Sequence, residues 1–226
     1  MIRALAIDID GTITDKSRRI NLDAIQKLRD LEKSGIPIIL ASGNNLCFMD
    51  TACLMIGTSG PLIAENGGIV ECGDDVYYLG DPKRVNHAFD ILSSKYELKK
   101  VKRSHLRITE IAVYRDIDVE ILEKEVDPDW GVDIVDSNFA IHIKDERVNK
   151  GEALKFVSGL IDVKPENIAA IGDSENDYEM IKYAGVGISI RDENMRGFCD
   201  YVTEKPFGEG ALEAIEYLTE NGYLKT

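Results

Sequence analysis

The sequence predicts an α/β fold: a Rossmann-like parallel-sheet core interrupted by a small inserted α+β cap domain. Short, almost continuously apolar runs such as 3–9 (RALAIDI) and 168–172 (IAAIG) are typical of strands covered on both faces, as in parallel sheets. Segments with helical apolar spacing alternate with such runs in the first and last thirds of the chain. Between them, 106–114 (LRITEIAVY) alternates like a sheet with one solvated face.

The first part of the predicted core alternates strands and helices. A helix over 22–34 follows from apolar residues at helical spacing, because Asn21 can cap its start and Gly35 suits its end. Further along, the turn sequences ENGG and ECGDD predict a β-hairpin. The other elements expected here are strands at 36–41 and 61–64, a helix at 45–56, and hairpin strands at 69–70 and 76–79.

The inserted domain is predicted over residues 83–148, which leaves 1–82 and 149–226 as the core. Its elements are expected to be helices at 83–97 and 118–126, and strands at 106–114, 131–135 and 139–144. The alternation of buried strands and helices then resumes, as in doubly wound α/β proteins. The closing elements are expected to be helices at 150–160, 175–183 and 209–221, with strands at 168–172 and 186–190.

Composition limits the partners and the compartment. The 226 residues carry 27 basic and 41 acidic side chains, and a net charge of −14 repels nucleic acid and anionic membranes. Four cysteines form no CxxC pair and only three histidines occur, which argues against zinc and fits reduced thiols. The N-terminal MIRALAIDID lacks the long apolar region of a signal peptide, so we expect a cytoplasmic protein. A monomer and a homodimer fit equally well.

The first candidate functional spot is DIDGT at 8–12, where the first predicted strand ends. Because strand side chains alternate, Asp8 and Asp10 should point the same way, and adjacent carboxylates repel unless a cation or proton lies between them. The carboxyl ends of strands are where open α/β sheets bind ligands. The alternative is an acidic turn that only ends the strand, since Asp-Gly is common in turns.

Two weaker spots can supply groups that bind phosphate. Ser42-Gly43-Asn44 follows the strand at 36–41, and a hydroxyl with free backbone N–H groups at a strand-to-helix junction can hold phosphate oxygens. A helix N-cap with a turn glycine explains this segment equally well. Lys150 opens a predicted helix, where a cation is unfavourable against the helix dipole and suggests an anionic partner. A solvated surface lysine is the simpler alternative.

The fourth spot, GDSEND at 172–177, overlaps the end of the buried strand 168–172. Asp173 lies at the strand end and Asp177 in the first helical turn, so their side chains should lie on a common side. Carboxylate oxygens of this kind suit Mg²⁺. An N-cap aspartate followed by acidic first-turn residues is the alternative, and it explains Glu175 but not so dense a cluster.

In chain order the four spots read D-x-D-G-T, S-G-N, K and G-D-x-x-x-D, and together they are far more specific than any one alone. The sequence therefore resembles the haloacid dehalogenase (HAD) superfamily of phosphohydrolases, in core and insert alike. The insert lies between the second and third spots, as in the subgroup of Cof-like sugar phosphatases, sucrose-phosphate phosphatases and archaeal-type phosphoglycolate phosphatases. The short chain, the SGN segment and the compact insert are most similar to the last of these.

The resemblance implies a mechanism for the acidic residues. Asp8 would attack phosphorus and form an aspartyl phosphate. Asp10 would protonate the leaving alkoxide and later deprotonate the hydrolytic water. Mg²⁺ would be held by Asp8, the backbone carbonyl of Asp10, and Asp173, with Asp177 binding it directly or through water.

The resemblance also implies which residues hold the phosphate. Lys150 would bind the phosphate and Asp8 on the side away from the metal. A hydroxyl and a backbone amide of the SGN segment would cradle a phosphoryl oxygen, although some relatives have threonine in place of the serine. Asn176 would orient the Asp173 side of the site. The implied phosphate- or substrate-binding residues are Lys150, Ser42, Gly43, Asn44 and Asn176.

The insert would act as a lid that excludes water and selects the leaving group. Several of its basic residues could reach a substrate carboxylate, but solvated charges on a sheet face explain any single one of them better. These residues are Arg103, His105, Arg107, His142 and Lys144. Glu65 and Asn66, on a core loop, could touch the substrate or could form only a turn.

The resemblance implies 2-phosphoglycolate as the substrate, hydrolysed to glycolate and phosphate. The alternatives are a phosphatase for sugar phosphates or for a broader range of small metabolites, a phosphomutase that returns the phosphoryl group to a sugar, and a non-catalytic phosphate sensor. Asp10 argues against the sensor, because a pure binder needs no acid/base residue. The compact insert favours a small substrate.

Overall fold

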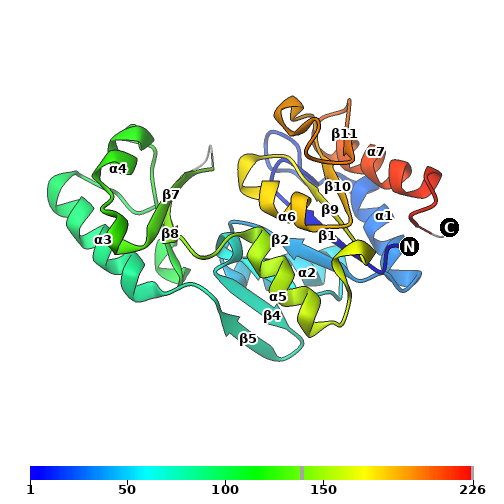
Figure 1. Ribbon diagram of the computed structural model, residues 1–226, viewed down its shortest axis with the longest axis horizontal. Helices are drawn as coiled ribbons and strands as arrows, with labels where there is room; N and C mark the ends of the chain where they lie inside the picture. Colours follow the sequence, from blue (N-terminus) through cyan, green and yellow to red (C-terminus); the bar gives the residue numbers. More distant parts are fainter. Residues whose placement is uncertain (138–139, 225–226) are drawn as a thin grey trace.

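The computed structural model describes residues 1–137 and 140–224. Within them, eight strands form the larger sheet (Figure 1). In spatial order they are β11 (Tyr201–Val202), β10 (Val186–Ser189), β9 (Ile168–Gly172), β1 (Ala4–Asp8), β2 (Ile38–Ala41), β3 (Leu62–Ala64), β4 (Ile69–Cys72) and β5 (Asp75–Tyr78). Neighbours from β11 to β3 run parallel, and β4 and β5 extend the sheet as an antiparallel hairpin.

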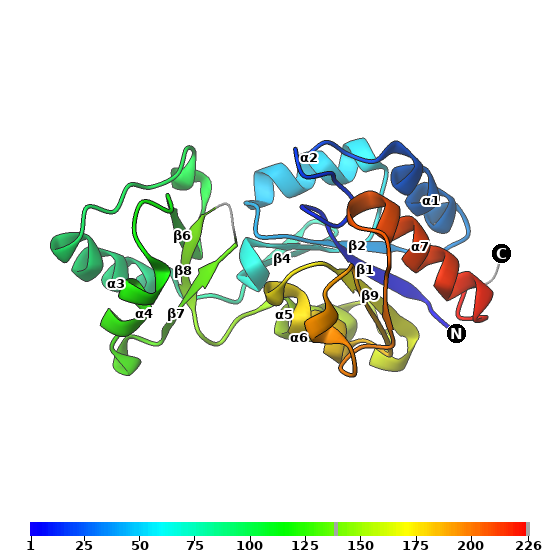
Figure 2. The ribbon, with the colours of Figure 1, turned by 90° about the horizontal axis from the view of Figure 1, so that it is seen from above.

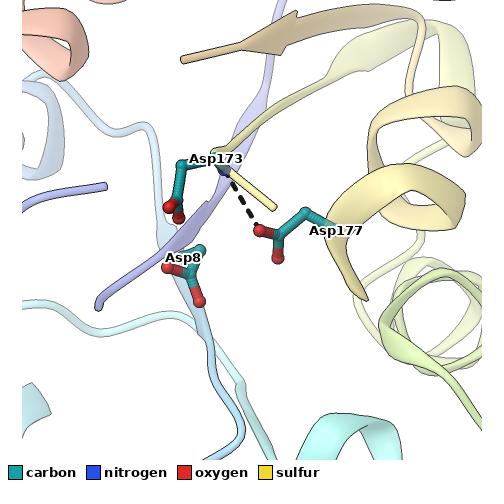
Figure 3. Close-up of side chains that lie close together, drawn as sticks. All are labelled: Asp8, Asp173 and Asp177. Carbon is teal, nitrogen blue, oxygen red and sulfur yellow. Dashed lines mark hydrogen bonds between the residues drawn. The ribbon is translucent and has the colours of Figure 1, made fainter. Parts of the chain in front are cut away.

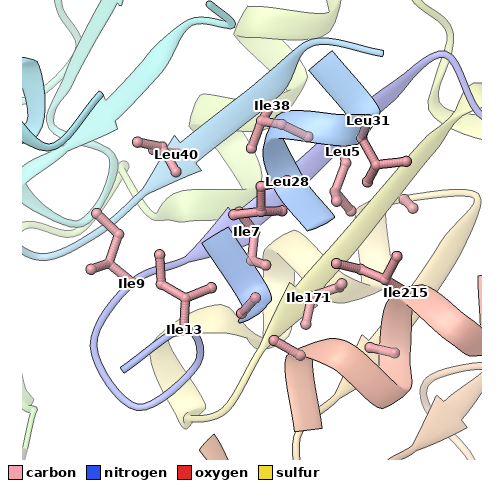
Figure 4. Packing of buried hydrophobic residues seen from close by; sticks show 14 of the residues in the cluster. Leu5, Ile7, Ile9, Ile13, Leu28, Leu31, Ile38, Leu40, Ile171 and Ile215 are labelled. Atoms are coloured by element: carbon pink, nitrogen blue, oxygen red, sulfur yellow. The ribbon is translucent and has the colours of Figure 1, made fainter. Parts of the chain in front are cut away.

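Helices cover both faces of this sheet (Figure 2). One face carries α1 (Leu22–Lys33), α2 (Leu46–Ile56) and α7 (Phe207–Glu220), and the other carries α5 (Lys150–Leu160) and α6 (Tyr178–Tyr183). Successive residues of β1 face the two layers: Leu5 and Ile7 share a cluster with Leu28 of α1 (Figure 4), whereas Ala6 packs in the cluster of Leu154. Burial on both faces explains why these strands are apolar with little alternation.

A smaller antiparallel sheet lies beside the first, with the order β6 (Glu110–Val113), β8 (Ile141–Asp145), β7 (Val132–Asp136). Helices α3 (Pro82–Lys95) and α4 (Val119–Glu125) pack on its face away from the larger sheet (Figure 1). Val85, Leu122 and Ile143 belong to the buried cluster between them. Short 3₁₀ turns occur at Glu65–Gly67, Ser104–Leu106, Pro128–Trp130, Pro165–Asn167, Glu175–Asp177 and Glu193–Met195. The predicted fold class is confirmed. None of the helices in the described part of the chain has the length and apolar character needed to cross a membrane.

The predicted strand 106–114 is too long at its start. The strand begins only at Glu110, after a 3₁₀ turn and an irregular segment. The backbone N–H groups of Ile108 and Thr109 donate to the carboxylate of Glu65 instead of to a neighbouring strand. A side chain more than 40 residues away therefore accepts the backbone hydrogen bonds of this segment. The local alternation of residues could not reveal such a distant acceptor.

Other differences are smaller. The predicted helix 175–183 opens with a 3₁₀ turn before α6, and there the Asp177 carboxylate accepts hydrogen bonds from the backbone N–H and the hydroxyl of Ser174. The two-residue strand β11 was not predicted, because so short a segment carries no readable pattern. Of the predicted strand 139–144, β8 contains the larger part, and Phe139 lies outside the described residues.

Candidate active site

The sheet topology gathers the four predicted spots at one edge. β2, β1 and β9 are parallel neighbours in that order, so their carboxyl ends lie together. Asp8 ends β1, Ser42 follows β2 and Asp173 follows β9. Lys150, the first residue of α5, reaches the same place and contacts Asp8. Figure 3 shows the carboxylates of Asp8, Asp173 and Asp177 grouped together.

The three carboxylates form a tight cluster. One oxygen from each of Asp8, Asp173 and Asp177 lies within 4.8 Å of the other two. Burial raises the pKa of Asp8 well above its usual value, and the other two carboxylates add to this rise against the opposing charge of Lys150. Burial and the charge of Asp177 also raise the pKa of Asp173 to about 6, although the Thr12 hydroxyl donates to its Oδ1 at 2.9 Å. Ionising the whole cluster is therefore costly in the metal-free protein.

The cluster fits a bound cation. The Oδ2 atom of Asp8 is buried and has no hydrogen-bond partner among the residues that the structure describes. An orphan acceptor next to two further carboxylates costs free energy unless a proton or a cation compensates it. Carboxylate oxygens are the ligands that hard divalent cations prefer. Asp8, Asp173 and Asp177 therefore form a candidate metal site.

Lys150 is the buried cation of the site. Its side chain is only 1% exposed, and its Nζ donates to Asp8 Oδ1 at 2.7 Å and to Asp177 Oδ1 at 2.6 Å. Burial acts to lower the pKa of Lys150, but the charges and hydrogen bonds of the two aspartates outweigh burial and raise it. The lysine therefore stays charged and joins the nucleophile candidate to the acidic pair that follows β9.

Asp10 has partners of its own on the wall of the cleft. Arg18 pairs with it through two hydrogen bonds, from Nε to Oδ1 at 2.7 Å and from Nη2 to Oδ2 at 3.0 Å. The Asn44 amide donates to Asp10 Oδ2 at 2.6 Å and to the Ser42 hydroxyl at 2.9 Å. Asp10, Ser42 and Asn44 thus form one hydrogen-bonded group. Arg18 was not predicted as part of the site, because it belongs to no motif and lies in an irregular loop.

Asn176 contacts the loop that carries Asp173. Its Oδ1 accepts from the hydroxyl of Ser174, the residue after Asp173, at 2.5 Å, and its amide donates to Asn66 Oδ1 at 3.1 Å. Asn176 therefore links the loop after β9 to the turn after β3.

A buried polar network continues from that turn into the smaller sheet. The amide of Asn66 donates to Glu110 Oε2 at 2.8 Å, and Glu110 Oε1 pairs with both Arg107 and His142. The Nη1 atom of Arg107 also donates to the carbonyl of Gly43 at 2.7 Å. Glu110 was not predicted as part of a network, because a single acidic residue in a strand of alternating polar and apolar residues is typical of the solvent-exposed face. The ENGG segment is thus more than a turn: it contacts the smaller sheet directly.

A cleft of about 1230 Å³ opens onto the site. Asp8 and Asp173 line it together with residues of the insert, whereas Lys150 and Asp177 lie behind its lining. Of the five basic residues of the insert that could reach a substrate, three line the cleft, namely Arg103, Arg107 and His142. Lys144 does not line the cleft. Its Nζ donates to Asp133 Oδ2 at 3.1 Å and to the Val148 carbonyl at 2.8 Å. His105 is not among the residues that line the cleft.

Comparison with known proteins agrees with this geometry. A family model of haloacid dehalogenase-like hydrolases matches residues 5–98 and 71–215. The chain belongs to this family. The cluster of aspartates at the strand ends and the buried lysine are thus the candidate catalytic groups of a haloacid dehalogenase-like hydrolase.

Relatives align over the full length of this hydrolase. Proteins named phosphoglycolate phosphatase from Methanothermobacter thermautotrophicus and Methanosarcina mazei are each 43% identical to it, over 95% and 98% of this chain and 97% and 99% of theirs. A solved structure from Thermoplasma acidophilum matches with a TM-score of 0.90 at 26% identity, covering 97% of this chain and 99% of that one. A haloacid dehalogenase-like hydrolase from Bacteroides thetaiotaomicron shares the fold with a TM-score of 0.81 at 19% identity, covering 96% and 100%.

Proposed function

We propose that this hydrolase is a magnesium-dependent phosphatase that converts 2-phosphoglycolate and water into glycolate and phosphate. The observation that carries the proposal is the Asp8 carboxylate, which is held by Lys150 through one oxygen, while the other oxygen has no hydrogen-bond partner in the described residues. A carboxylate in this state is suited to attack a phosphorus atom. The shared name of full-length relatives at 41–43% identity supports the substrate.

The reaction then takes two displacements. The Asp8 carboxylate attacks phosphorus, the bond from phosphorus to the glycolate oxygen breaks, and Asp10 gives its proton to that oxygen. In the second step water attacks the phosphorus of the aspartyl phosphate, Asp10 takes a proton from the water, and phosphate leaves Asp8. The hydrogen bonds from Arg18 and Asn44 hold the Asp10 carboxylate on the cleft wall, which supports its role as the acceptor of the proton from the attacking water.

The acidic cluster would hold Mg²⁺ through Asp8, Asp173 and Asp177 together with the backbone carbonyl of Asp10. When bound, the metal offsets the repulsion between the nucleophilic carboxylate and the phosphate dianion. Lys150 provides a second, permanent positive charge on Asp8, and it keeps this carboxylate oriented between steps.

The phosphate would lie against the loop after β2. The Ser42 hydroxyl and the Gly43 amide would cradle a phosphoryl oxygen there. The position of both residues on the cleft wall, with Asn44 and Asn176, supports this role. We propose that residues 83–148 form one cap domain that closes over the substrate and excludes water. We further propose a cytoplasmic protein with no nucleic-acid or membrane partner, for which a monomer and a homodimer fit equally.

Phosphate release by the Mg²⁺-loaded protein from 2-phosphoglycolate, hexose phosphates and p-nitrophenyl phosphate tests the substrate. We expect the highest kcat/KM for 2-phosphoglycolate, whereas a preference for hexose phosphates would make the protein a sugar phosphatase. Conversion of one hexose phosphate into another without phosphate release would indicate a mutase.

The nucleophile is tested by the Asp8→Asn variant, which should lose turnover while its circular dichroism spectrum stays unchanged. Near-normal turnover of this variant would refute the mechanism. Asp10→Asn should slow both proton transfers, so that phosphoenzyme accumulates or forms slowly. Removal of metal by a chelator should abolish turnover, and added Mg²⁺ should restore it.

A further inference from the structure

Arg107 holds a special position where the insert meets the core. In the chain it lies between the 3₁₀ turn Ser104–Leu106 and β6, and its side chain is 11% exposed. One nitrogen, Nη1, makes both of its hydrogen bonds to described residues, to the Gly43 carbonyl at 2.7 Å and to Glu110. Arg107 therefore touches the loop that would hold the phosphate, although it belongs to the cap.

The other edge of the guanidinium is available. Within the part of the chain that the structure describes, Nε and Nη2 of Arg107 make no hydrogen bond, and the residue lines the cleft. These two nitrogens present parallel N–H donors, the arrangement that binds a carboxylate through both of its oxygens. The orientation of this edge is fixed, because the opposite nitrogen, Nη1, pairs with the fully buried carboxylate of Glu110.

The charges on the cap wall favour an anion. Among the described residues of the cap that line the cleft, Lys102, Arg103 and Arg107 are basic and none is acidic, although the whole chain carries a net charge of −14. Burial lowers the pKa of Arg107, and the positive charge of Arg18, from the core side of the cleft, lowers it further, while the charge of Glu65 opposes both. An anion between the two guanidinium groups would relieve this repulsion.

We propose that Arg107 binds the carboxylate of the substrate's leaving group and thereby selects short phosphorylated carboxylic acids over phosphate esters that lack a carboxylate. This rests on the proposed phosphatase function. Arg107 is hydrogen-bonded to Gly43, so its free edge lies next to the phosphate loop. In 2-phosphoglycolate the carboxylate is bonded directly to the ester carbon and so lies close to the phosphate, whereas a hexose phosphate has no second anionic group.

The network behind Arg107 fixes it relative to the cluster of Asp8, Asp173 and Asp177. Glu110 accepts a hydrogen bond from Asn66, and Asn66 accepts one from Asn176. Asn176 accepts from the Ser174 hydroxyl in the loop of the acidic cluster. Glu110 is therefore a positioning residue, and a change there should alter the selectivity for carboxylates more than the hydrolysis of an ester that lacks one.

The decisive comparison uses 2-phosphoglycolate and ethyl phosphate, which has the same chain length and no carboxylate. In the wild type we expect kcat/KM to be at least about 30-fold higher for 2-phosphoglycolate. This is the fold-change expected from a hydrogen bond between charged groups. Arg107→Gln should reduce this ratio to within a few-fold of one, and Arg107→Lys, which keeps the charge but not the paired donors, should give an intermediate ratio. The control is Arg84→Gln, which removes a cap arginine paired with Glu146 outside the cleft and should leave the ratio unchanged.

A binding measurement separates this inference from the proposed function. Calorimetry should show 3-phosphonopropionate binding at least about 10-fold more tightly than propylphosphonate to the wild type, with the difference lost in Arg107→Gln. That result supports the role of Arg107 even if 2-phosphoglycolate is not turned over, which would refute only the proposed substrate. A wild type without preference for the carboxylate, an unchanged ratio in Arg107→Gln, or an equal loss on both substrates in both Arg107 variants would overturn the inference. Thermal unfolding of each variant identifies a loss caused by misfolding.

Discussion

Replacing Asp173 with asparagine should stabilise the metal-free protein and remove its response to Mg²⁺. Burial and Asp177 raise the pKa of Asp173 from 3.8 to about 6, so ionised Asp173 destabilises the folded state above that pH. At about 1.4 kcal/mol per pKa unit, this penalty is at most about 3 kcal/mol at pH 7.5. Asparagine avoids the charge and keeps an oxygen that can accept the hydrogen bond from Thr12. We therefore expect a gain of about 1–3 kcal/mol in the free energy of unfolding without metal.

The sign with pH follows from the same shift. Because the folded state binds this proton more tightly than the unfolded state, the wild-type penalty is fully present above about pH 6 and disappears as the pH falls towards 4. Urea unfolding at pH 7.5 and at pH 4.5, with a chelator or with Mg²⁺, measures the difference between the variant and the wild type. That difference should shrink at the lower pH, and Mg²⁺ should stabilise only the wild type.

The matched control is Glu175→Gln, which removes the same charge from an exposed neighbouring position and should change the free energy of unfolding by less than about 0.5 kcal/mol. A metal-free Asp173→Asn variant that is less stable than the wild type at pH 7.5 would refute the reasoning. So would equal stabilisation of both proteins by Mg²⁺, because Asp173 would then not be a ligand.

Two further predictions concern buried groups that hold the site together. Lys150→Met should lower phosphatase activity at least about 100-fold and should cost about 3–5 kcal/mol of stability without metal, because Asp8 and Asp177 lose their buried cation; a stable variant in urea unfolding would contradict this. Glu65→Gln should cost about 1–3 kcal/mol, since the carboxylate accepts from the backbone N–H of Ile108 through Oε1 and from that of Thr109 through Oε2, whereas an amide has only one accepting oxygen. Faster hydrogen exchange at Ile108 or Thr109 should accompany the loss, and unchanged exchange at both would show that this contact does not hold the insert.

The apolar runs and their spacing determined most of the fold. Strands such as 3–9 and 168–172 were predictable because residues buried on both faces of a sheet must be apolar, and this requirement is local. The strand at 106–114 was predicted too long because its first residues are satisfied by a carboxylate from another element. A pattern of alternation does not distinguish hydrogen bonds to a strand from hydrogen bonds to a distant side chain.

The candidate site was predictable for a similar reason. Asp8, Asp173 and Lys150 each lie where a strand ends or a helix begins, and the parallel arrangement of β2, β1 and β9 brings such ends to one edge. The partners of these residues were not predictable, because they depend on contacts across long stretches of the chain. Lys150 bonds Asp8, 142 positions away, and Asn176 bonds Asn66, 110 positions away.

The sequence by itself thus determined the fold class, the acidic cluster and the reaction that such a cluster supports. Only the tertiary structure decided that Arg18 pairs with Asp10, that Glu65 binds the insert, and that Arg107 lines the cleft with two nitrogens that bond no described residue. The physical reason is the distance along the chain over which each feature acts. Periodicity and turn chemistry depend on the local burial of each residue. An ion pair or a buried network depends on which distant elements the folded core brings within hydrogen-bonding distance.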